Sequence, residues 1–349
     1  MKKYWQSQKF KRINRRRSEK AMKRLSKMKA KKRRINRGNK VKNIQFHGTV
    51  TVYAPTNFSI INNIEEMLSF YEKIIKTAKN KHALVLDARD IKSITPDSIL
   101  YLLSMFEYLK KKFGNFPIRG TFPINSDCKR VFVQSGFPKY FKTRENINYD
   151  DADILTIESS IAVESVIAKK VVKFARDHLG EQRSNKSKRA YEIIIECMGN
   201  TYDHAYNSKS PLPKWYLMAI YDNINKSVNF VFLDGGLGIP KTIRRNHVEK
   251  IQQFITGVTR KFLSMTAIDD SFLISSALNG EFRTKTEMGH RGKGLPKIKK
   301  CAETNEINGL KIISGFGSFD VGTLQAREIK RQFMGTLFSW SHIQGGDLK

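Results

Sequence analysis

The sequence has little cysteine, few acidic residues relative to basic ones, and no long apolar run. Its three cysteines, Cys128, Cys197 and Cys301, lie far apart and follow no metal-ligand spacing, so they are typical of reduced structural thiols. No apolar run approaches the roughly 20 residues that a membrane-spanning helix needs, and the basic N-terminus lacks the apolar core of a secretory signal. We therefore expect a cytoplasmic protein that does not enter a membrane.

The shortage of acidic residues is greatest at the N-terminus. The chain has 64 Lys and Arg residues against 32 Asp and Glu, and residues 1–42 hold 20 of those bases but one acid, Glu19. This segment is rich in helix formers, yet its apolar stripe is too thin to build a core. Self-repulsion therefore predicts a basic tail, residues 1–43, that is helical or disordered until an anionic partner binds.

Nucleic acid is the expected partner of the tail. Dense Arg and Lys neutralise phosphates and release counterions, and Tyr4, Trp5 and Phe10 could stack on unpaired bases. An anionic membrane surface and a solvated tail with no dedicated ligand are the alternatives. Nothing in the pattern reads a base sequence or separates DNA from RNA. The basic side chains assigned to phosphate contacts are Arg12, Arg15, Arg16, Arg17, Lys31, Lys32, Arg33 and Arg34.

The rest of the chain is long enough for two domains. From residue 44 to 145, short strand patterns alternate with amphipathic helices, which predicts a small α/β layer. The first of these helices carries Ile64, Leu68, Tyr71 and Ile75 on one face.

A second helix in this region is opened by Pro96, with Asp97 as an N-cap or first-turn acid, and ends at Gly114. The stretch LVLDARDIKSITPDSILYLLSMFEYLKKKFG and the later VFVQSGFPKYF resemble a STAS domain, the fold of anti-sigma-factor antagonists. The resemblance implies that this region binds a protein partner. Where the family has D-S-S-G, this chain reads D-S-I-L. Ser98 is therefore either a phosphorylation site or, as the missing glycine favours, a structural serine.

Residues 146–158 contain Asp150, Asp151 and Asp153 and are expected to form a linker. Three neighbouring acids could hold a metal ion, but a solvated polar joint explains them better. The helical pattern that follows ends at Gly180.

A further helical pattern runs from Tyr191 to Ala205. Glu196, Asn200 and His204 are spaced i, i+4, i+8 and share one face beside an apolar stripe. A carboxylate can orient a water molecule, and an amide oxygen can complete the shell of a Mg²⁺ ion. Taken alone, this spacing is better explained by an ordinary surface helix.

Three blocks that contain glycine follow this helix. The first, VNFVFLDGGLGIP, is a buried strand pattern that breaks at Asp234 into a glycine-rich turn. The second, MGHRGKGLPKIKK, leads from glycines into a basic helix, and the third, MGTLFSW, opens an apolar strand with Thr336. An ordinary turn would explain any one block, but the recurrence of all of them in sequence favours a binding site.

The four blocks, in this order, resemble the GHKL ATPases, the family of gyrase, heat-shock chaperones, histidine kinases and MutL. That family has an N-box E-x-x-x-N, then D-x-G-x-G, then a lid G-x-x-G-x-G-L, then a strand that carries Thr. The resemblance implies that residues 159–349 form an ATP-binding domain of the Bergerat type. The expected fold class is therefore α+β, a two-layer α/β sandwich preceded by the STAS-like layer and the basic tail.

The resemblance implies a role for each matching residue. Glu196 would be the general base, Asn200 the Mg²⁺ ligand, and Asp234 the acceptor for the adenine amino group. Thr336 would support the adenine end, and His204 would either contact phosphate or only pack. The positions implied to approach adenine or phosphate closely are Gly236, Gly238, Gly289, Gly292, Lys293, Gly294 and Leu295.

ATP and Mg²⁺ are thus the expected cofactors, and slow ATP hydrolysis used as a conformational switch is the expected activity. The tail would couple this switch to nucleic acid, and the STAS-like layer would couple it to a protein. Residues 247–288 take the place of the ATP lid and would couple it to a partner or to a second copy in a homodimer. One alternative is a serine/threonine kinase of the anti-sigma type, and another is a module that binds ATP without hydrolysing it. A two-component kinase is rejected because His178 does not lie in a dimerising helix hairpin.

Overall fold

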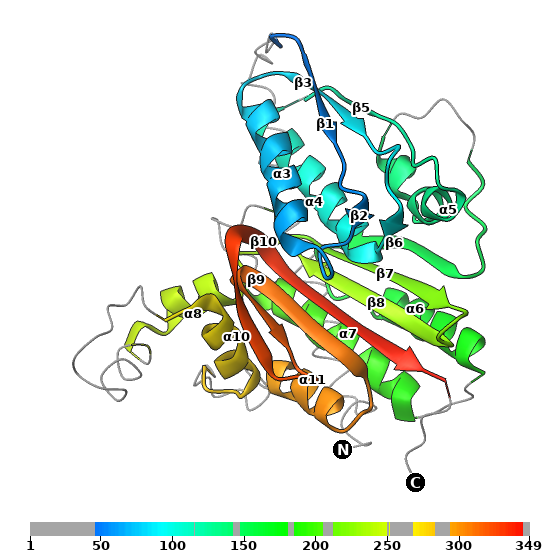
Figure 1. Ribbon diagram of the computed structural model, residues 1–349. Coiled ribbons are helices and arrows are strands. Elements are labelled where there is room, and N and C mark those ends of the chain that lie inside the picture. Colours follow the sequence, from blue (N-terminus) through cyan, green and yellow to red (C-terminus); the bar gives the residue numbers. More distant parts are fainter. Residues whose placement is uncertain are drawn as a thin grey trace, which may run out of the picture. The chain divides into compact units, whose positions relative to one another are not determined.

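The computed structural model describes residues 46–114, 116–141, 147–180, 185–204, 212–249, 251, 268–282 and 294–344, except for the side chains of 185, 186, 203 and 204 (Figure 1). The basic tail lies outside these ranges, and with it every side chain assigned to nucleic acid. From His47 onward the chain forms one compact unit. The protein is mixed α and β, as expected, with both parallel and antiparallel sheets. Within the described ranges, no helix is long and apolar enough to cross a membrane.

Residues 47–141, which we call the N-terminal layer, alternate strands and helices. Strands β1, β3 and β5 form a parallel sheet in the order β1-β3-β5, and β2 pairs parallel with β4. The elements are β1 (Thr49–Tyr53), β2 (Asn57–Phe58), α3 (Ile64–Lys79), β3 (Ala83–Asp87), β4 (Ser93–Ile94), α4 (Pro96–Phe113), β5 (Ile118–Gly120), α5 (Ser126–Gln134) and the 3₁₀ helix η1 (Phe137–Tyr140). The alternation predicted for this region is confirmed.

The second part of the unit is built on a five-stranded antiparallel sheet in the order β6-β7-β8-β10-β9. Its strands are β6 (Ile154–Ser160), β7 (Trp215–Asp222), β8 (Ser227–Asp234), β9 (Asn308–Asp320) and β10 (Gln325–Ile343). The helices are α6 (Ser165–Leu179), α7 (Asn185–His204), α8 (Ile239–Asn246), α10 (Asp270–Leu278) and α11 (Gly294–Glu303). Residues 154–158, expected in the linker, thus form the start of a strand, because Ile154, Leu155 and Ile157 are buried in the sheet.

One face of the five-stranded sheet packs against α6, α7 and α11. Its side chains include Trp215, Phe230, Phe232 and Trp340, which are buried in the main apolar core together with residues of the three helices. The rings of Phe230 and Trp340 are stacked with centroids 5.3 Å apart. Burial of such large aromatic side chains is a major source of folding free energy.

The opposite face of this sheet is also buried. Because successive residues of a strand point to opposite faces, Tyr216, Met218, Val231 and Leu233 lie on the other side, and none is more than 2% exposed. Helix α4 contacts β7 and β8, and α3 contacts β10. Helices α3 and α4 therefore lie between the parallel sheet of the N-terminal layer and the antiparallel sheet (Figure 1).

This position explains the composition of α4. Five consecutive residues, from Ile99 to Leu103, are each at most 1% exposed, as expected of a helix with apolar partners on opposite sides. The amphipathic α3 instead buries one face, on which the predicted Leu68 and Tyr71 are confirmed and the predicted Ile64 and Ile75 are half-buried.

Asp97 and Ser98 join the first turn of α4 to the loop before α3. Asp97 Oδ2 accepts hydrogen bonds from the backbone N–H groups of Ile60 at 2.6 Å and Ile61 at 3.3 Å, and Ser98 Oγ accepts from Ile60 N at 2.8 Å. Burial raises the pKa of Asp97. The predictions of a first-turn acid and of a structural serine are both confirmed.

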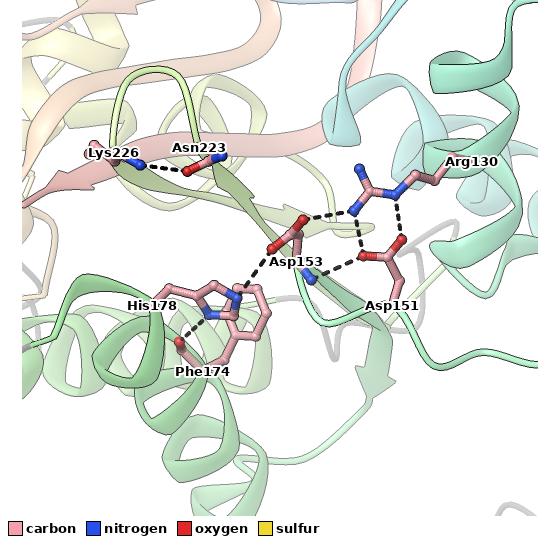
Figure 2. Close-up of polar contacts among 7 residues, drawn as sticks. All are labelled: Arg130, Asp151, Asp153, Phe174, His178, Asn223 and Lys226. Atoms are coloured by element: carbon pink, nitrogen blue, oxygen red, sulfur yellow. Dashed lines mark hydrogen bonds and ion pairs between the residues drawn. The ribbon is translucent and has the colours of Figure 1, made fainter.

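An ion-pair network joins α5 to the beginning of β6 and to α6 (Figure 2). Arg130 donates from Nε to Asp151 at 2.6 Å and from Nη2 to Asp153 at 2.8 Å, and its charge and hydrogen bonds lower the pKa of Asp151. Asp153 Oδ1 also lies 3.6 Å from Nε2 of His178, whose Nδ1 is 2.9 Å from the carbonyl oxygen of Phe174. The segment predicted to be a solvated joint is therefore held by ion pairs at two of its three acids, Asp151 and Asp153. In the part of the chain that the structure describes, no group of three acids, histidines or cysteines is arranged for a metal.

Candidate functional site

Helix α7 supplies the first group of site residues. Its apolar stripe is confirmed, because Ile194, Cys197 and Met198 are each at most 1% exposed in the main core. Glu196 and Asn200 follow one turn apart on the neighbouring face and are half-buried. The amide nitrogen of Asn200 is buried and has no hydrogen-bond partner among the described residues. A buried amide in this state is unusual, because leaving a polar group unpaired costs free energy.

The beginning of α11 lies against these two side chains. A Cβ atom placed on Gly294 would be 3.0 Å from Oε2 of Glu196 and 3.4 Å from Oδ1 of Asn200. Such an approach leaves the backbone of the first turn, rather than a side chain, beside the carboxylate and the amide. The N-terminus of a helix carries partial positive charge and unpaired N–H groups, which favour anions.

Lys297, one turn into α11, adds a full positive charge. Its Nζ lies 3.2 Å from Oε2 of Glu192 and 3.9 Å from Oε1 of Glu196. Burial alone would raise the pKa of Glu192, but the hydrogen bond from Arg189 and the charge of Lys297 outweigh it, and the pKa is lowered. Arg189 also pairs with Glu306, so this network holds α7 against the segment that follows α11.

Asp234 ends β8 and forms the second group of the site. The N–H of Gly236 donates to Asp234 Oδ1 at 2.8 Å. The nearby Thr201 hydroxyl of α7, which donates to the carbonyl of Cys197 at 3.1 Å, acts to lower the pKa of the Asp234 carboxyl. Burial raises the pKa of Asp234 to about 7. A carboxylate held by a turn N–H at the end of a strand is suited to accept one more hydrogen bond from a ligand.

Thr336 of β10 lies next to Asp234, which is its register partner on the neighbouring strand β8. Its hydroxyl is buried 3.1 Å from the hydroxyl of Ser314, which donates to the carbonyl of Gly335 at 2.8 Å and accepts from Ile239 N at 2.9 Å. Ser314 thus joins β9, β10 and the beginning of α8, and sequence reasoning missed it. The signal that could have found it is ISGFG, since glycines inside a strand mark close backbone approaches.

Glycine is required at two positions of this group. Gly335 has φ +91°, and a Cβ there would come within 2.0 Å of the carbonyl oxygen of Asp234. Gly238 has φ +85°, and a Cβ would come within 2.7 Å of Ser314 Oγ. Both values of φ favour glycine. The close contact at Gly238 is with Ser314 of the protein itself, while Gly236 contributes its N–H to Asp234.

The described part of the expected lid is held in place by ion pairs and apolar packing. Arg244 of α8 pairs with the buried Asp270 of α10, and Asp270 Oδ2 accepts from Phe316 N at 2.6 Å. Ile243, Ile251, Leu273 and Ala277 form a small core beside this pair, against which the predicted Leu295 packs. Within the expected lid segment, residues 270–278 form α10.

Several predicted residues are not described. Gly289, Gly292 and Lys293 lie outside the described ranges, as do residues 250, 252–267 and 283–288 of the expected lid. His204 is the last residue of α7, and its side chain is among those not described. The predicted residues that the structure does describe are Glu196, Asn200, Asp234, Gly236, Gly238, Gly294, Leu295 and Thr336.

The site residues fit a metal that arrives with its ligand. Mg²⁺ is usually held by one or two protein oxygens together with phosphate oxygens and water, and rarely by an all-protein cage. The amide oxygen of Asn200 is the atom suited to that role, whereas its buried nitrogen, which has no partner among the described residues, is a donor suited to a phosphate oxygen. The chain matches no family model, and no curated protein matches it.

Proposed function

We propose that the protein binds Mg-ATP and hydrolyses it slowly, as a switch between conformations. The observation that carries this proposal is that one helix, α7, supplies the first group of the site and also reaches the second group. Glu196 and Asn200 lie against Gly294, and the hydroxyl of the next residue, Thr201, is close enough to Asp234 to lower the pKa of its carboxyl. A nucleotide has an adenine end and a phosphate end, and residues suited to each are joined by one helix.

At the adenine end, ionised Asp234 would accept a hydrogen bond from the exocyclic amino group of the base. The N–H of Gly236 orients this carboxylate, and Thr336 lies beside it on the next strand. Gly238 and Gly335 let the backbone pack closely around Asp234 and Ser314, because a Cβ at either position would clash with the surrounding backbone or with Ser314. This arrangement would read the amino group by polar contact and the ring by shape.

At the phosphate end, Glu196 would take a proton from the water that attacks the γ-phosphate. The backbone at Gly294 and the charge of Lys297 would lie on the phosphate side of that carboxylate. When bound, Mg²⁺ neutralises charge on the phosphate oxygens, and Asn200 is the residue that would hold it. Positioning and electrostatic stabilisation account for most of the acceleration in phosphoryl transfer.

The antiparallel sheet with α6, α7 and α11 on one face supports a GHKL-type assignment for residues 159–349, and the parallel sheet supports a STAS-like assignment for the N-terminal layer. We further propose that the tail binds DNA or RNA and that the N-terminal layer binds a protein. The kinase alternative gains nothing from Ser98, which is fully buried and hydrogen-bonded to Ile60 N. The idle-module alternative is weakened by Glu196, because a site that only binds has no need of a base.

The experiment that tests this proposal is ATP turnover by the wild type and by Glu196→Ala, each with and without DNA or RNA. Loss of the base should lower kcat by about 10²-fold or more while ATP binding, measured by calorimetry, is retained. Glu303→Ala is the matched control, because Glu303 is an exposed acid of α11 that pairs with Lys299. Stimulation by nucleic acid that also requires residues 1–42 would connect the tail to the switch.

The possible failures of this experiment are distinct. ATP binding without turnover in any mixture would overturn the hydrolysis and lead to assays of phosphate transfer to a STAS-like protein. Equal turnover in the wild type and Glu196→Ala would remove Glu196 from the reaction. Absence of ATP binding would overturn the whole proposal.

A further inference from the structure

Strand β10 is irregular immediately before Thr336. Its register with β9 shifts between Glu328 and Phe333 and again between Phe333 and Thr336. Gly335, with its positive φ, lies in the second shift. Irregular strands leave backbone groups without ladder partners, so the groups of this stretch need hydrogen bonds from elsewhere.

A tyrosine of the N-terminal layer supplies one of them. Tyr101 of α4 is 1% exposed, and its hydroxyl oxygen accepts a hydrogen bond from the backbone N–H of Met334 at 3.0 Å. Its ring is stacked on Phe333, with centroids 4.3 Å apart and an interplanar angle of 23°. One side chain therefore holds both residues that precede Gly335.

Helix α3 makes hydrogen bonds to the same stretch of β10 a few residues earlier in the chain. Lys330 N donates to Oε1 of Glu65 at 2.8 Å, and Arg331 Nε donates to Oε2 of Glu72 at 2.9 Å. The irregular part of β10 is thus hydrogen-bonded to two helices of the N-terminal layer at three residues, Lys330, Arg331 and Met334. Two residues beyond Met334 is Thr336, the register partner of Asp234.

We propose that Tyr101 is a positioning residue for the nucleotide site, and that through it the N-terminal layer sets the affinity for ATP. Tyr101 fixes Met334, and Met334 fixes the backbone of Gly335 and Thr336. These two residues form the side of the site on β10, next to Asp234. The inference rests on the proposed function, because it assumes that this side faces a nucleotide. It adds that a protein partner bound to the layer so as to shift α4 changes ATP affinity, and that ATP changes the partner's affinity by the same factor.

The test is a pair of tyrosine-to-phenylalanine substitutions. Tyr101→Phe keeps the ring on Phe333 and removes only the acceptor for Met334 N. Tyr71→Phe is the matched control, because Tyr71 is equally buried, packs edge-on against Tyr101 at 4.7 Å, and donates its hydroxyl to the carbonyl of Ser98 at 3.0 Å. Each variant loses one buried hydrogen bond, but Tyr71 makes its bond within the N-terminal layer.

Both variants should melt at somewhat lower temperature than the wild type. Tyr101→Phe should in addition weaken ATP binding by roughly five- to tenfold, as expected when a buried hydrogen bond at the site is lost, whereas Tyr71→Phe should bind ATP like the wild type. Calorimetric titration well below both melting temperatures gives the affinity. Hydrogen exchange of the free proteins should show faster exchange of the Met334 amide in Tyr101→Phe alone.

The outcomes separate the inference from the proposed function. Wild-type protein that does not bind ATP overturns the proposed function. Wild-type protein that binds ATP, together with a Tyr101→Phe variant of unchanged affinity, overturns the positioning role and leaves the proposed function standing. Equal weakening in both variants would also overturn it, because the effect would then come from general loss of stability.

Discussion

The two faces of the five-stranded sheet are both buried, but they are covered by different parts of the chain and in different ways. On one face, α6, α7 and α11 continue the same part of the sequence and carry Glu196, Asn200 and Gly294 to the site. On the other face, α3 and α4 come from the N-terminal layer and carry no residue with a proposed role in chemistry. That second face instead contributes polar anchors: Glu107 of α4 lies 2.8 Å from both Lys214 Nζ and Tyr216 Oη.

The difference shows that the N-terminal layer covers one face of the five-stranded sheet and so completes its apolar core. The same layer is also the candidate surface for a protein partner. A tethered domain would leave the sheet face polar, whereas Tyr216, Met218, Val231 and Leu233 are buried beneath α3 and α4. Removal of such a cover exposes a contiguous apolar surface. The comparison therefore separates a face that supplies chemistry from a face that supplies support.

The largest expected effect comes from removing the second cover entirely. Residues 147–349 alone should aggregate or lack a cooperative melting transition, because the face under α3 and α4 becomes exposed to water. Residues 46–349, which lack only the basic tail, are the control and should melt cooperatively. Expression of both chains followed by size-exclusion chromatography and circular dichroism measures this. A monomeric 147–349 chain with a sharp transition would show that the two faces are not equivalent in the core.

A single methyl group at the site should have the next largest effect. Gly335→Ala places a Cβ against the carbonyl of Asp234 in a strained φ region, and we expect a loss of roughly 3 kcal/mol or more in unfolding free energy together with loss of ATP binding. Gly309→Ala is the control, since Gly309 also has positive φ, at +58°, but has no heavy atom within 4 Å of the added Cβ. Its cost should be about 1 kcal/mol. Urea denaturation compares the two, and equal costs would mean that the close approach at Gly335 is not real.

The smallest of these effects concerns the pH dependence of Asp234. Its pKa in the folded protein, about 7, lies above the usual value of 3.8, so its burial leaves stability intact below about pH 4 and costs stability as the pH rises through about 7. A ligand that donates to the ionised carboxylate has the opposite dependence. ATP affinity should therefore increase by up to about tenfold between about pH 6 and about pH 8.

Asp234→Asn separates this effect from the titration of the phosphates themselves. The variant should bind ATP more weakly, and the ratio of wild-type to variant affinity should rise with pH, because the phosphates titrate equally in both. Calorimetry at several pH values measures the ratio. A constant ratio would mean that Asp234 does not change its protonation state in this range.

Much of the architecture could be predicted from local pattern. The amphipathic spacing of Leu68 and Tyr71 gave the buried face of α3, and the glycines Gly114 and Gly180 correctly predicted the ends of α4 and α6. The helix that contains Tyr101 was predicted, but its two partners are far away in the sequence, so no local pattern could tell which surfaces it separates. The position of β6 was missed because three aspartates precede it and resemble a linker.

The site was predictable where the type of residue indicates the local backbone geometry. Asp234 before glycines predicted a strand end, which the structure bears out, whereas the approach of Gly238 to a base stays a prediction. The roles of Ser314 and Tyr101 were missed, because both come from contacts with residues far along the chain. The glycines near Ser314 mark a close backbone approach without identifying its partner, and Tyr101 has no such local signal. Arg130 is similar, since its pairing with Asp151 depends on how the N-terminal layer meets β6.

Strand β8 has a neighbouring strand on each edge and a layer of helices over each face, so its amide protons can reach water almost solely through unfolding of the whole molecule. Asp234 stands at the end of this strand, and Gly294 stands at the first turn of a peripheral helix. Any slow breathing of the folded chain would therefore loosen the Gly294 end long before the Asp234 end. A bound nucleotide would keep its base in a fixed frame while the surroundings of its phosphates rearrange.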